Sequence, residues 1–374
     1  MSKALNSKQV MALIKAVGTQ RTVLVEGEAG VGKTSIHYAL SADPAFAGYY
    51  APKPIDCMQL SDGSVWMPDL DRSRGVSTEL PNERFGVSME NHKGVAGAKP
   101  VLICLDEIGK TRQFIKDVLA PIVYERRVGQ HELPEGSIVF GCTNLTDEGL
   151  GDSMQAHLRN RLIIVRQAKP TKDEWVRDFA IPRGLHEEVI AAAEMYPMVF
   201  DSFLDYRPGG KFAGKNMRSD NPYISDPSSQ AQSQVVTPRS LHTASDIVTS
   251  RAGMDETTLE SALAGAVGEA FAANIVTMIR FGAQLPAYGR VVADPGGTKV
   301  PENVMACVVQ IFQFIKQVKD KEEAEQVSIY TQRMKAEMRS LFVNAIANSS
   351  VLDKFGLSAT FSLLLKDNRQ YLGQ

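Results

Sequence analysis

Apolar residues in the first part of the chain form short, unbroken runs that polar stretches separate. Four of these runs indicate strands, and each is apolar throughout rather than alternating, as is typical of strands buried on both faces of a parallel sheet. They are residues 22–26, 101–105, 137–142 and 161–165, with 54–58 as a shorter candidate. Between two of them, apolar residues from Ile115 to Val123 follow a helical spacing, and Pro121 within it favours a kink or a later start. The pattern predicts an α/β fold, a parallel sheet between helices in three layers.

The pattern changes after residue 165, where helical periodicity replaces the apolar runs. Helices are expected at residues 170–175, 184–196, 240–252, 259–282, 302–319 and 322–349. Two stretches interrupt them, a long polar loop at 207–238 and a link at 285–301 that Pro and Gly punctuate. The predicted organisation is an α/β nucleotide-binding domain at 1–168, an all-α lid domain at 169–285 and additional C-terminal helices at 286–374.

A glycine-rich segment directly follows the first predicted strand. It reads Gly27-Glu28-Ala29-Gly30-Val31-Gly32-Lys33-Thr34-Ser35 and leads into a predicted helix, so it matches G-x-x-x-x-G-K-T in the required context. Glycines let the backbone turn tightly, so that successive N–H groups point inward at phosphates. Lys33 adds a positive charge for the β- and γ-phosphates, and the Thr34 hydroxyl stands where a Mg²⁺ ligand belongs. We expect this segment to bind a nucleoside triphosphate.

A pair of acids, Asp106 and Glu107, ends the apolar run at 101–105. A buried strand of this kind delivers its first acid beside the phosphates to organise Mg²⁺. The second acid is then placed to orient and deprotonate the attacking water. Two acids that begin a solvated loop are the alternative interpretation, and the phosphate-binding loop upstream argues against it. The pair therefore predicts hydrolysis of the bound nucleotide.

Further motifs follow in a fixed order. They are Asp106-Glu107-Ile108-Gly109-Lys110, Tyr124-Glu125-Arg126-Arg127-Val128, Thr143-Asn144-Leu145, His157-Leu158-Arg159-Asn160-Arg161-Leu162 and Thr237-Pro238-Arg239-Ser240. With these motifs, residues 1–250 resemble the AAA+ ATPases, and among them the MoxR-like, or dynein-related, group. Two positions differ from the group's pattern, because Leu145 stands in place of a proline and Leu162 in place of a phenylalanine.

The resemblance implies roles for single residues and an assembly. Asn144 corresponds to the sensor-1 residue and Arg239 to sensor 2. Arg161, with Arg159 as the second choice, corresponds to the arginine finger that reaches the γ-phosphate held by the neighbouring subunit. The resemblance also implies ATP and Mg²⁺ as cofactors. It implies a homo-oligomeric ring, expected to be a hexamer, that remodels a client protein, often one with a von Willebrand A-type domain.

Residues 59–99 lack periodicity, and we expect loops with short insertions there. In MoxR-like rings the zone that corresponds to residues 61–93 contains a helix-2 insertion and loops that face the central pore, so Trp66, Met67 and Phe85 could grip a substrate polypeptide. A surface loop that buries its aromatic residues in a small core of its own explains the same residues equally well.

Composition narrows the possible partners and the compartment. The net charge is −2 and the isoelectric point is near 6.3, which argues against a surface built for nucleic acid. No apolar run approaches the roughly 20 residues of a membrane-spanning helix. The N-terminus lacks the apolar core of a signal peptide, so we expect a cytoplasmic protein. Four cysteines without a C-x-x-C pair, and six histidines without ligand spacing, predict no structural metal site.

Three other functions are consistent with parts of the sequence. The stretch from Leu158 to Leu162 also resembles that of helicase and branch-migration ATPases, so a nucleic-acid-directed motor is one alternative. A related GTP-specific restriction motor is another, since a phosphate-binding loop does not select the base. A non-catalytic nucleotide-binding scaffold is disfavoured because Lys33, Asp106 and Glu107 are all present.

Overall fold

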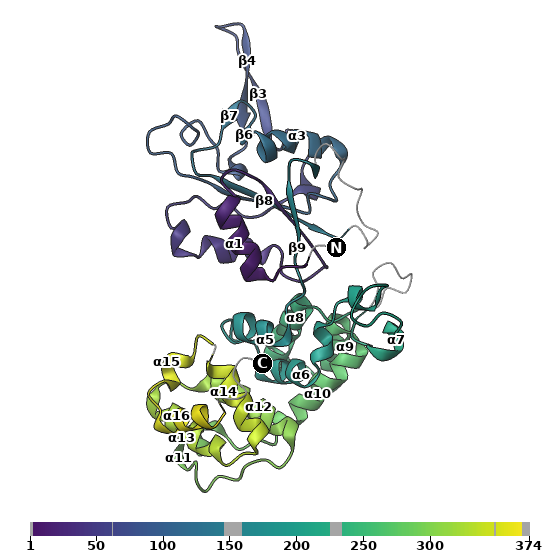
Figure 1. Cartoon of the computed structure of the whole chain (residues 1–374), viewed down its shortest axis with the longest axis vertical. Coiled ribbons are helices and arrows are strands. Elements are labelled where there is room, and N and C mark those ends of the chain that lie inside the picture. Colours follow the sequence, from purple (N-terminus) through teal and green to yellow (C-terminus); the bar gives the residue numbers. More distant parts are fainter. Residues whose placement is uncertain (1–2, 62, 146–158, 225–233, 348, 369–374) are drawn as a thin grey trace. The chain divides into compact units, whose positions relative to one another are not determined.

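The computed structural model describes residues 3–61, 63–145, 159–224, 234–347 and 349–368 (Figure 1). The chain forms two compact units. The N-terminal unit comprises Met1–Lys169, and the helical unit comprises Pro170–Ser225 and Ala231–Gln374. Among the described residues, no helix combines the length and the apolar character needed to cross a bilayer.

The N-terminal unit contains a five-stranded parallel sheet in the order β2-β5-β8-β1-β9. Its strands are β1 (Val23–Gly27), β2 (Ile55–Asp56), β5 (Leu102–Asp106), β8 (Ile138–Asn144) and β9 (Ile163–Arg166). Each of the five predicted strands is present, with ends that differ from the prediction by one or two residues. The longest, β8, is buried along its length except at Asn144, as expected for a strand covered on both faces.

Helices cover both faces of this sheet. On one face, α1 (Ser7–Val17) and α2 (Ser35–Ser41) pack against Val23 and Val25 of β1. On the other face, α3 (Gln113–Tyr124) packs in a second cluster with Leu24 and Ile103. Alternate residues of one strand therefore enter different cores, and the predicted three-layer α/β fold is confirmed. The helix α3 continues past Pro121 to Tyr124.

Two hairpins add to the N-terminal unit, and one of them corrects the prediction of loops between residues 59 and 99. β3 (Trp66–Asp71) and β4 (Val76–Pro81) form an antiparallel ribbon, seen extending from the unit in Figure 1. β6 (Arg127–Val128) and β7 (His131–Glu132) form the second, shorter hairpin. Both strands of the ribbon are largely exposed, so neither face carries the alternation that marks a half-buried strand.

The helical unit begins with α5 (Lys172–Trp175), whose N-terminus has the predicted capping box between Thr171 and Glu174. The other helices are α6 (Glu187–Met195), α7 (Met217–Asp220), α8 (Pro238–Thr249), α9 (Glu256–Val267), α10 (Glu269–Gly282), α11 (Tyr288–Ala293), α12 (Val304–Gln317), α13 (Lys321–Gln332), α14 (Ala336–Ala347), α15 (Leu352–Phe355) and α16 (Ala359–Asp367). One hydrophobic cluster includes residues from Trp175 to Leu364. The predicted lid and the predicted C-terminal helices thus contribute to one core.

Two long helices predicted in this unit are each divided. The stretch 259–282 breaks at Gly268, which has φ 80° and separates α9 from α10. A side chain is excluded there, because a Cβ atom would lie 2.7 Å from the carbonyl oxygen of Gln234. The stretch 322–349 is divided into α13 and α14 by residues 333–335, which include no glycine, and the link at 285–301 contains the short helix α11.

Candidate active site

The glycine-rich segment forms a tight loop between β1 and α2, as its sequence predicts. Gly30 and Gly32 adopt φ values of 73° and 95°, a region that residues with a side chain rarely occupy. A Cβ atom on Gly32 would lie 2.9 Å from the Ser35 hydroxyl. Glycine at these two positions is therefore what allows the loop to close around a ligand with its backbone N–H groups.

Lys33 is buried in this loop, with 6% of its surface exposed. Its ammonium donates hydrogen bonds to the carbonyl oxygens of Gly27 and Glu28, both at 2.8 Å, and to Oδ1 of Asn144 at 2.7 Å. Asn144 comes within reach because β1 pairs with β8 in a register that sets Gly27 beside it. The sheet thus unites the loop lysine with the predicted sensor 1, which lies 111 residues away in sequence.

Asp106 and Thr34 meet at the end of β5. The Thr34 hydroxyl donates to Oδ2 of Asp106 at 2.8 Å, and Oδ1 of Asp106 accepts from the backbone N–H of Glu107 at 3.1 Å. A hydroxyl and a carboxylate side by side are the hard oxygen donors that Mg²⁺ prefers, beside phosphate oxygens. These two predicted ligands therefore fit a magnesium ion.

Glu107 adopts φ 53°, one of two described residues other than glycine with a positive φ. The turn that it begins is pressed against β8, because the Ile108 N–H donates to the Cys142 carbonyl oxygen at 3.2 Å. The approach is close at Gly109, where a Cβ atom would lie 2.2 Å from the Thr143 hydroxyl oxygen. This conformation costs on the order of 1 kcal/mol for a residue with a side chain and persists because the surrounding contacts determine it.

The carboxylate of Glu107 is half-buried, and its Oε2 atom has no hydrogen-bond donor among the described residues. The Lys110 ammonium lies 3.3 Å from that atom. A buried acceptor with a free lone pair fits the predicted role of accepting a proton from water. No role for Lys110 was predicted from the sequence, although its spacing of three residues from Glu107 across a turn is a signal that could have indicated the ion pair.

Arg159 and Arg161 lie at the opposite end of the sheet. Both are exposed, and both precede β9, which is parallel to β1 and begins with Ile163 beside Val23. Val23 is four residues before Gly27, so the start of β9 is about 13 Å from the loop at ~3.3 Å per residue. The two arginines lie further from the loop still, beyond the reach of a side chain. His157 and Leu158 of the same motif lie outside the described residues.

Arg239 lies in the first turn of α8, in the helical unit, and its side chain is exposed. The helix begins where the motif predicts, with Thr237 as its cap and Pro238 in its first turn. The role of Arg239 as sensor 2 stays a prediction. Of the residues that were expected to contact substrate, Phe85 is fully buried, whereas Met67 is 56% exposed on the ribbon.

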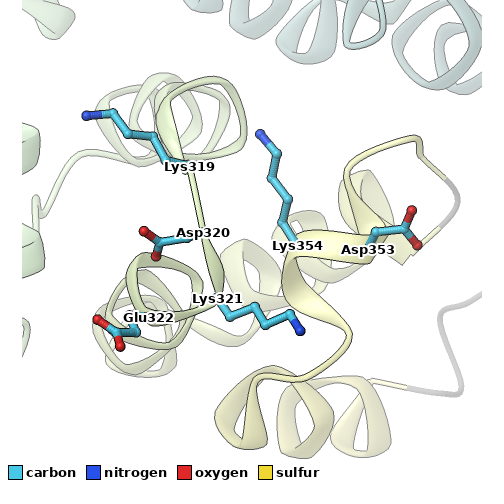
Figure 2. Close-up of a pocket in the computed structure, with 6 residues that line it drawn as sticks. All are labelled: Lys319, Asp320, Lys321, Glu322, Asp353 and Lys354. Atoms are coloured by element: carbon cyan, nitrogen blue, oxygen red, sulfur yellow. The ribbon is translucent and has the colours of Figure 1, made fainter.

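A pocket of about 570 Å³ opens in the helical unit, and it contains none of the predicted site residues (Figure 2). Three lysines and three carboxylates line it, namely Lys319, Asp320, Lys321, Glu322, Asp353 and Lys354. Two of these have structural partners. Lys354 donates to the Val318 carbonyl oxygen at 2.7 Å, and Asp320 accepts from the Glu323 N–H at the start of α13. Balanced charge on an open surface indicates no particular ligand.

Burial makes the two cysteines near the site, Cys57 and Cys104, poor nucleophiles. Burial raises the pKa of the Cys57 thiol well above its ordinary value, and the neighbouring Asp106 carboxylate raises it further. Burial also raises the pKa of Cys104. Within the described ranges, no group of three or more His, Cys, Asp or Glu side chains is arranged to hold a metal ion.

No family model matches the sequence, and no curated protein matches it. Several solved structures are similar to the chain. NtrX from Brucella abortus in complex with ADP is 14% identical over 99% of this chain and 69% of its own, with a TM-score of 0.38. The Hsp104–ADP complex of S. cerevisiae is 13% identical over 100% and 49%, with a TM-score of 0.33. A mutant of RuvB from Thermotoga maritima is 13% identical over 81% of each chain, with the same TM-score.

These neighbours are AAA+ ATPases. Their TM-scores lie below 0.5. The α/β fold of this chain is evident from its own parallel sheet and the helices on both faces of the sheet.

Proposed function

We propose that this chain is an AAA+ ATPase of the MoxR-like type that hydrolyses MgATP. One observation carries the proposal: Lys33, Thr34, Asp106, Glu107 and Asn144 converge at the carboxyl ends of β1, β5 and β8. Open parallel sheets bind ligands at this edge. Each of the five residues also has the chemical type that phosphoryl transfer from a nucleotide requires.

The reaction follows from these positions. The loop N–H groups and Lys33 bind the β- and γ-phosphates, while Thr34 and Asp106 would hold Mg²⁺, which neutralises phosphate charge. Glu107 accepts a proton from a water molecule as the water oxygen bonds to the γ-phosphorus. The bond from that phosphorus to the β–γ bridging oxygen breaks, and ADP leaves with the electron pair. Asn144, hydrogen-bonded to Lys33, lies where it can orient the γ-phosphate and the water.

The proposal includes an assembly, because the arginines cannot serve the site of their own chain. Arg161 lies at the amino end of the sheet and the phosphate-binding loop at the carboxyl end. A finger therefore needs a second copy whose loop faces it. Two different surfaces in contact generate a ring when the rotation between copies closes. We propose that Arg161 is the finger of such a ring.

The proposed ring remodels a client protein, as the MoxR-like resemblance implies, and a von Willebrand A-type domain is the client we would test first. ATP turnover is measured with and without that domain, with double-stranded DNA in a parallel arm. Stimulation by the domain supports the proposal. If DNA stimulates ATP turnover and the domain does not, the proposed protein client is contradicted and a nucleic-acid-directed motor is favoured.

The ATPase activity is tested with two variants and two nucleotides. Lys33→Ala removes the charge on the β- and γ-phosphates, so we expect it to abolish nucleotide binding. Glu107→Gln keeps the shape of the side chain but not the base, so we expect binding to persist and turnover to fall by ~10²-fold or more. Binding of a fluorescent ATP analogue and release of phosphate from ATP and GTP are measured. Wild-type turnover by Glu107→Gln overturns the proposal, and a preference for GTP overturns the choice of base.

A further inference from the structure

The guanidinium of Arg161 lies over the aromatic ring of Tyr124, 5.1 Å from the ring centroid. Tyr124 is the last residue of α3, and Arg161 lies two residues before β9. No hydrogen bond or ion pair to another described residue holds this guanidinium. The ring face is thus the contact that selects one direction for an exposed side chain with many rotamers.

We propose that Tyr124 is a positioning residue, whose ring holds the Arg161 guanidinium in the direction it needs to reach the γ-phosphate of a neighbouring subunit. The proposal rests on the proposed function, in which Arg161 is the arginine finger. In this role Tyr124 contacts the Arg161 side chain rather than the nucleotide. It reduces the number of conformations that the Arg161 side chain adopts before it binds the γ-phosphate.

A short chain of hydrogen bonds fixes the ring relative to the finger. The Thr22 hydroxyl, on a residue that is 2% exposed, donates to the Val123 carbonyl oxygen at 2.7 Å. The Thr22 carbonyl oxygen in turn accepts from the Ile163 N–H at 3.0 Å. The residue before Tyr124 and the second residue after Arg161 are therefore both hydrogen-bonded to Thr22, which directly precedes β1. The end of α3 and the start of β9 cannot move apart without breaking a buried bond.

The charges in this contact suit attraction. Burial raises the pKa of the Tyr124 phenol to about 12, although the positive charge of Arg161 lowers it. The ring is consequently neutral at physiological pH, and its π face attracts the cation.

The turn before β9 distinguishes the two candidate fingers. The Leu162 N–H donates to the Arg159 carbonyl oxygen at 3.2 Å, which sets Arg161 in the middle of a turn. An aromatic contact is recorded for Arg161 and not for Arg159 in the part of the chain that the structure describes. The structure therefore provides a support for the side chain of Arg161 in particular.

The test compares Tyr124→Leu, Tyr124→Phe, Arg161→Ala and the double variant Tyr124→Leu/Arg161→Ala in the full-length chain. A contact with an exposed cation predicts that Tyr124→Leu lowers kcat by about three- to tenfold, with KM for ATP unchanged. Tyr124→Phe keeps the ring face and should retain wild-type kcat. In the Arg161→Ala background, Tyr124→Leu should have no additional effect. Thermal unfolding and oligomeric state are recorded for each variant.

The outcomes separate this inference from the proposed function. Loss of turnover in Arg161→Ala together with wild-type turnover in Tyr124→Leu overturns the positioning role and leaves the finger intact. Wild-type turnover in Arg161→Ala overturns both. An equal loss from Tyr124→Leu with and without Arg161 shows that the ring acts through something other than the finger, and this also overturns the inference. If Tyr124→Leu fails to fold, Tyr124→Phe and Tyr124→Trp are compared instead, because both keep an aromatic ring face. If both variants fold well and both have a lower kcat than wild type, the role of the ring face is contradicted.

Discussion

At the scale of single residues, the site depends on the tightly packed turn that begins at Glu107. Glu107 is held in the left-handed region, and two residues later Gly109 touches the Thr143 hydroxyl at the end of β8. Backbone strain persists only where neighbouring contacts determine it. The contact at Gly109 is one of those that aim the proposed base, although Gly109 has no side chain and no chemistry of its own.

We therefore expect Gly109→Ala to uncouple binding from hydrolysis. The added Cβ atom, 2.2 Å from Oγ1 of Thr143, forces the turn away from β8 and moves Glu107 from its position. Turnover should fall by about 10- to 100-fold, since a misplaced general base loses most of its effect. Affinity for ATP should remain within about threefold of wild type, because the loop that binds phosphates is untouched.

Gly48→Ala is the matched control, because no heavy atom lies within 4 Å of a Cβ atom built at Gly48. Phosphate release and equilibrium nucleotide binding are measured on both variants. Unchanged turnover in Gly109→Ala would show that the turn has room to adapt.

Much of the site could be predicted at this scale, and the reason is local. Lys33 and Thr34 belong to one loop whose spacing is fixed by the backbone, and Asp106 and Asn144 end neighbouring strands of a parallel sheet. The ion pair between Lys110 and Glu107 has one local signal, the spacing of three residues, but its geometry could not be predicted in this way. It depends on the φ angle of Glu107, which follows from packing against β8 rather than from local sequence.

At the scale of helices and strands, prediction succeeded where burial leaves a pattern. The strands of the parallel sheet are covered on both faces, so their apolar runs identified them. The β3–β4 ribbon is exposed on both faces. Its apolar side chains, such as Met67 and Leu70, therefore do not follow the alternation of apolar and polar residues that marks a half-buried strand. Its strands are fixed by cross-strand pairing and by a turn in which Asp71 accepts hydrogen bonds from the N–H groups of Ser73 and Arg74.

His186 directly precedes α6, is mostly buried, and makes the helical unit sensitive to acid. His186 is 13% exposed and lies 3.3 Å from a carboxylate oxygen of Glu188 and 3.6 Å from one of Glu187. Burial lowers the pKa of His186 to about 4, and the charges of Lys316 and Arg251 lower it too, whereas Glu187 raises it. The folded protein therefore keeps His186 neutral at a pH where the unfolded chain binds a proton.

The sign of the effect follows. Between pH 6.5 and about 4 the unfolded state binds more protons at this residue, so the free energy of unfolding decreases as the pH falls and levels off near pH 4. The loss by pH 5 should be on the order of 1–2 kcal/mol. Glu188, whose pKa burial raises, opposes this loss at the acidic end of the window.

Urea unfolding at pH 7 and pH 5 measures the effect. Unfolding is monitored by the fluorescence of the buried Trp175 in a Trp66→Phe background, in which Trp175 is the remaining tryptophan. His186→Asn should reduce the pH dependence, and His92→Asn in the N-terminal unit should not. Equal pH dependence in wild type and His186→Asn would assign the effect to other groups.

At the scale of the whole molecule, the chain has two sets of cores. Among the described residues, the clusters of the N-terminal unit end at Val165, and the cluster of the helical unit begins at Trp175. Within the helical unit, α12 packs against α6 and α10, across the boundary predicted near residue 285. Sequence patterns mark where helices lie, but they do not show which helices share a core.

Fragments test this organisation. A chain of residues 170–374 should unfold in one cooperative transition, because it retains the whole cluster. A chain of residues 170–285 exposes the surfaces of α6 and α10 that α12 covers, so it should lack a cooperative transition and bind a hydrophobic dye. Circular dichroism and dye fluorescence distinguish the two. Cooperative unfolding of the shorter fragment would show that the lid is a domain of its own.

Mixing two inactive variants tests the shared site. Arg161→Ala lacks the proposed finger and should lose turnover by ~10³-fold, whereas Lys33→Ala lacks a working pocket. In a random equal mixture, about a quarter of the interfaces pair an intact pocket with an intact finger, so about a quarter of wild-type activity should return. Arg159→Ala is the matched control and should stay active alone. Absence of rescue in mixed rings, with activity per chain independent of dilution, contradicts a shared site.

The polarity of the parallel sheet also has a consequence for inheritance. In the proposed ring, each chain takes part in two reaction centres, because its pocket and its proposed finger lie at opposite ends of the strands. A copy that lacks only Lys33 disables one centre, whereas a copy that lacks both Lys33 and Arg161 disables its own and its neighbour's. In a cell with equal amounts of normal and altered chains, the single change leaves about half of the centres working and the double change about a quarter. The double change should therefore be the more dominant allele, although neither altered chain is active alone.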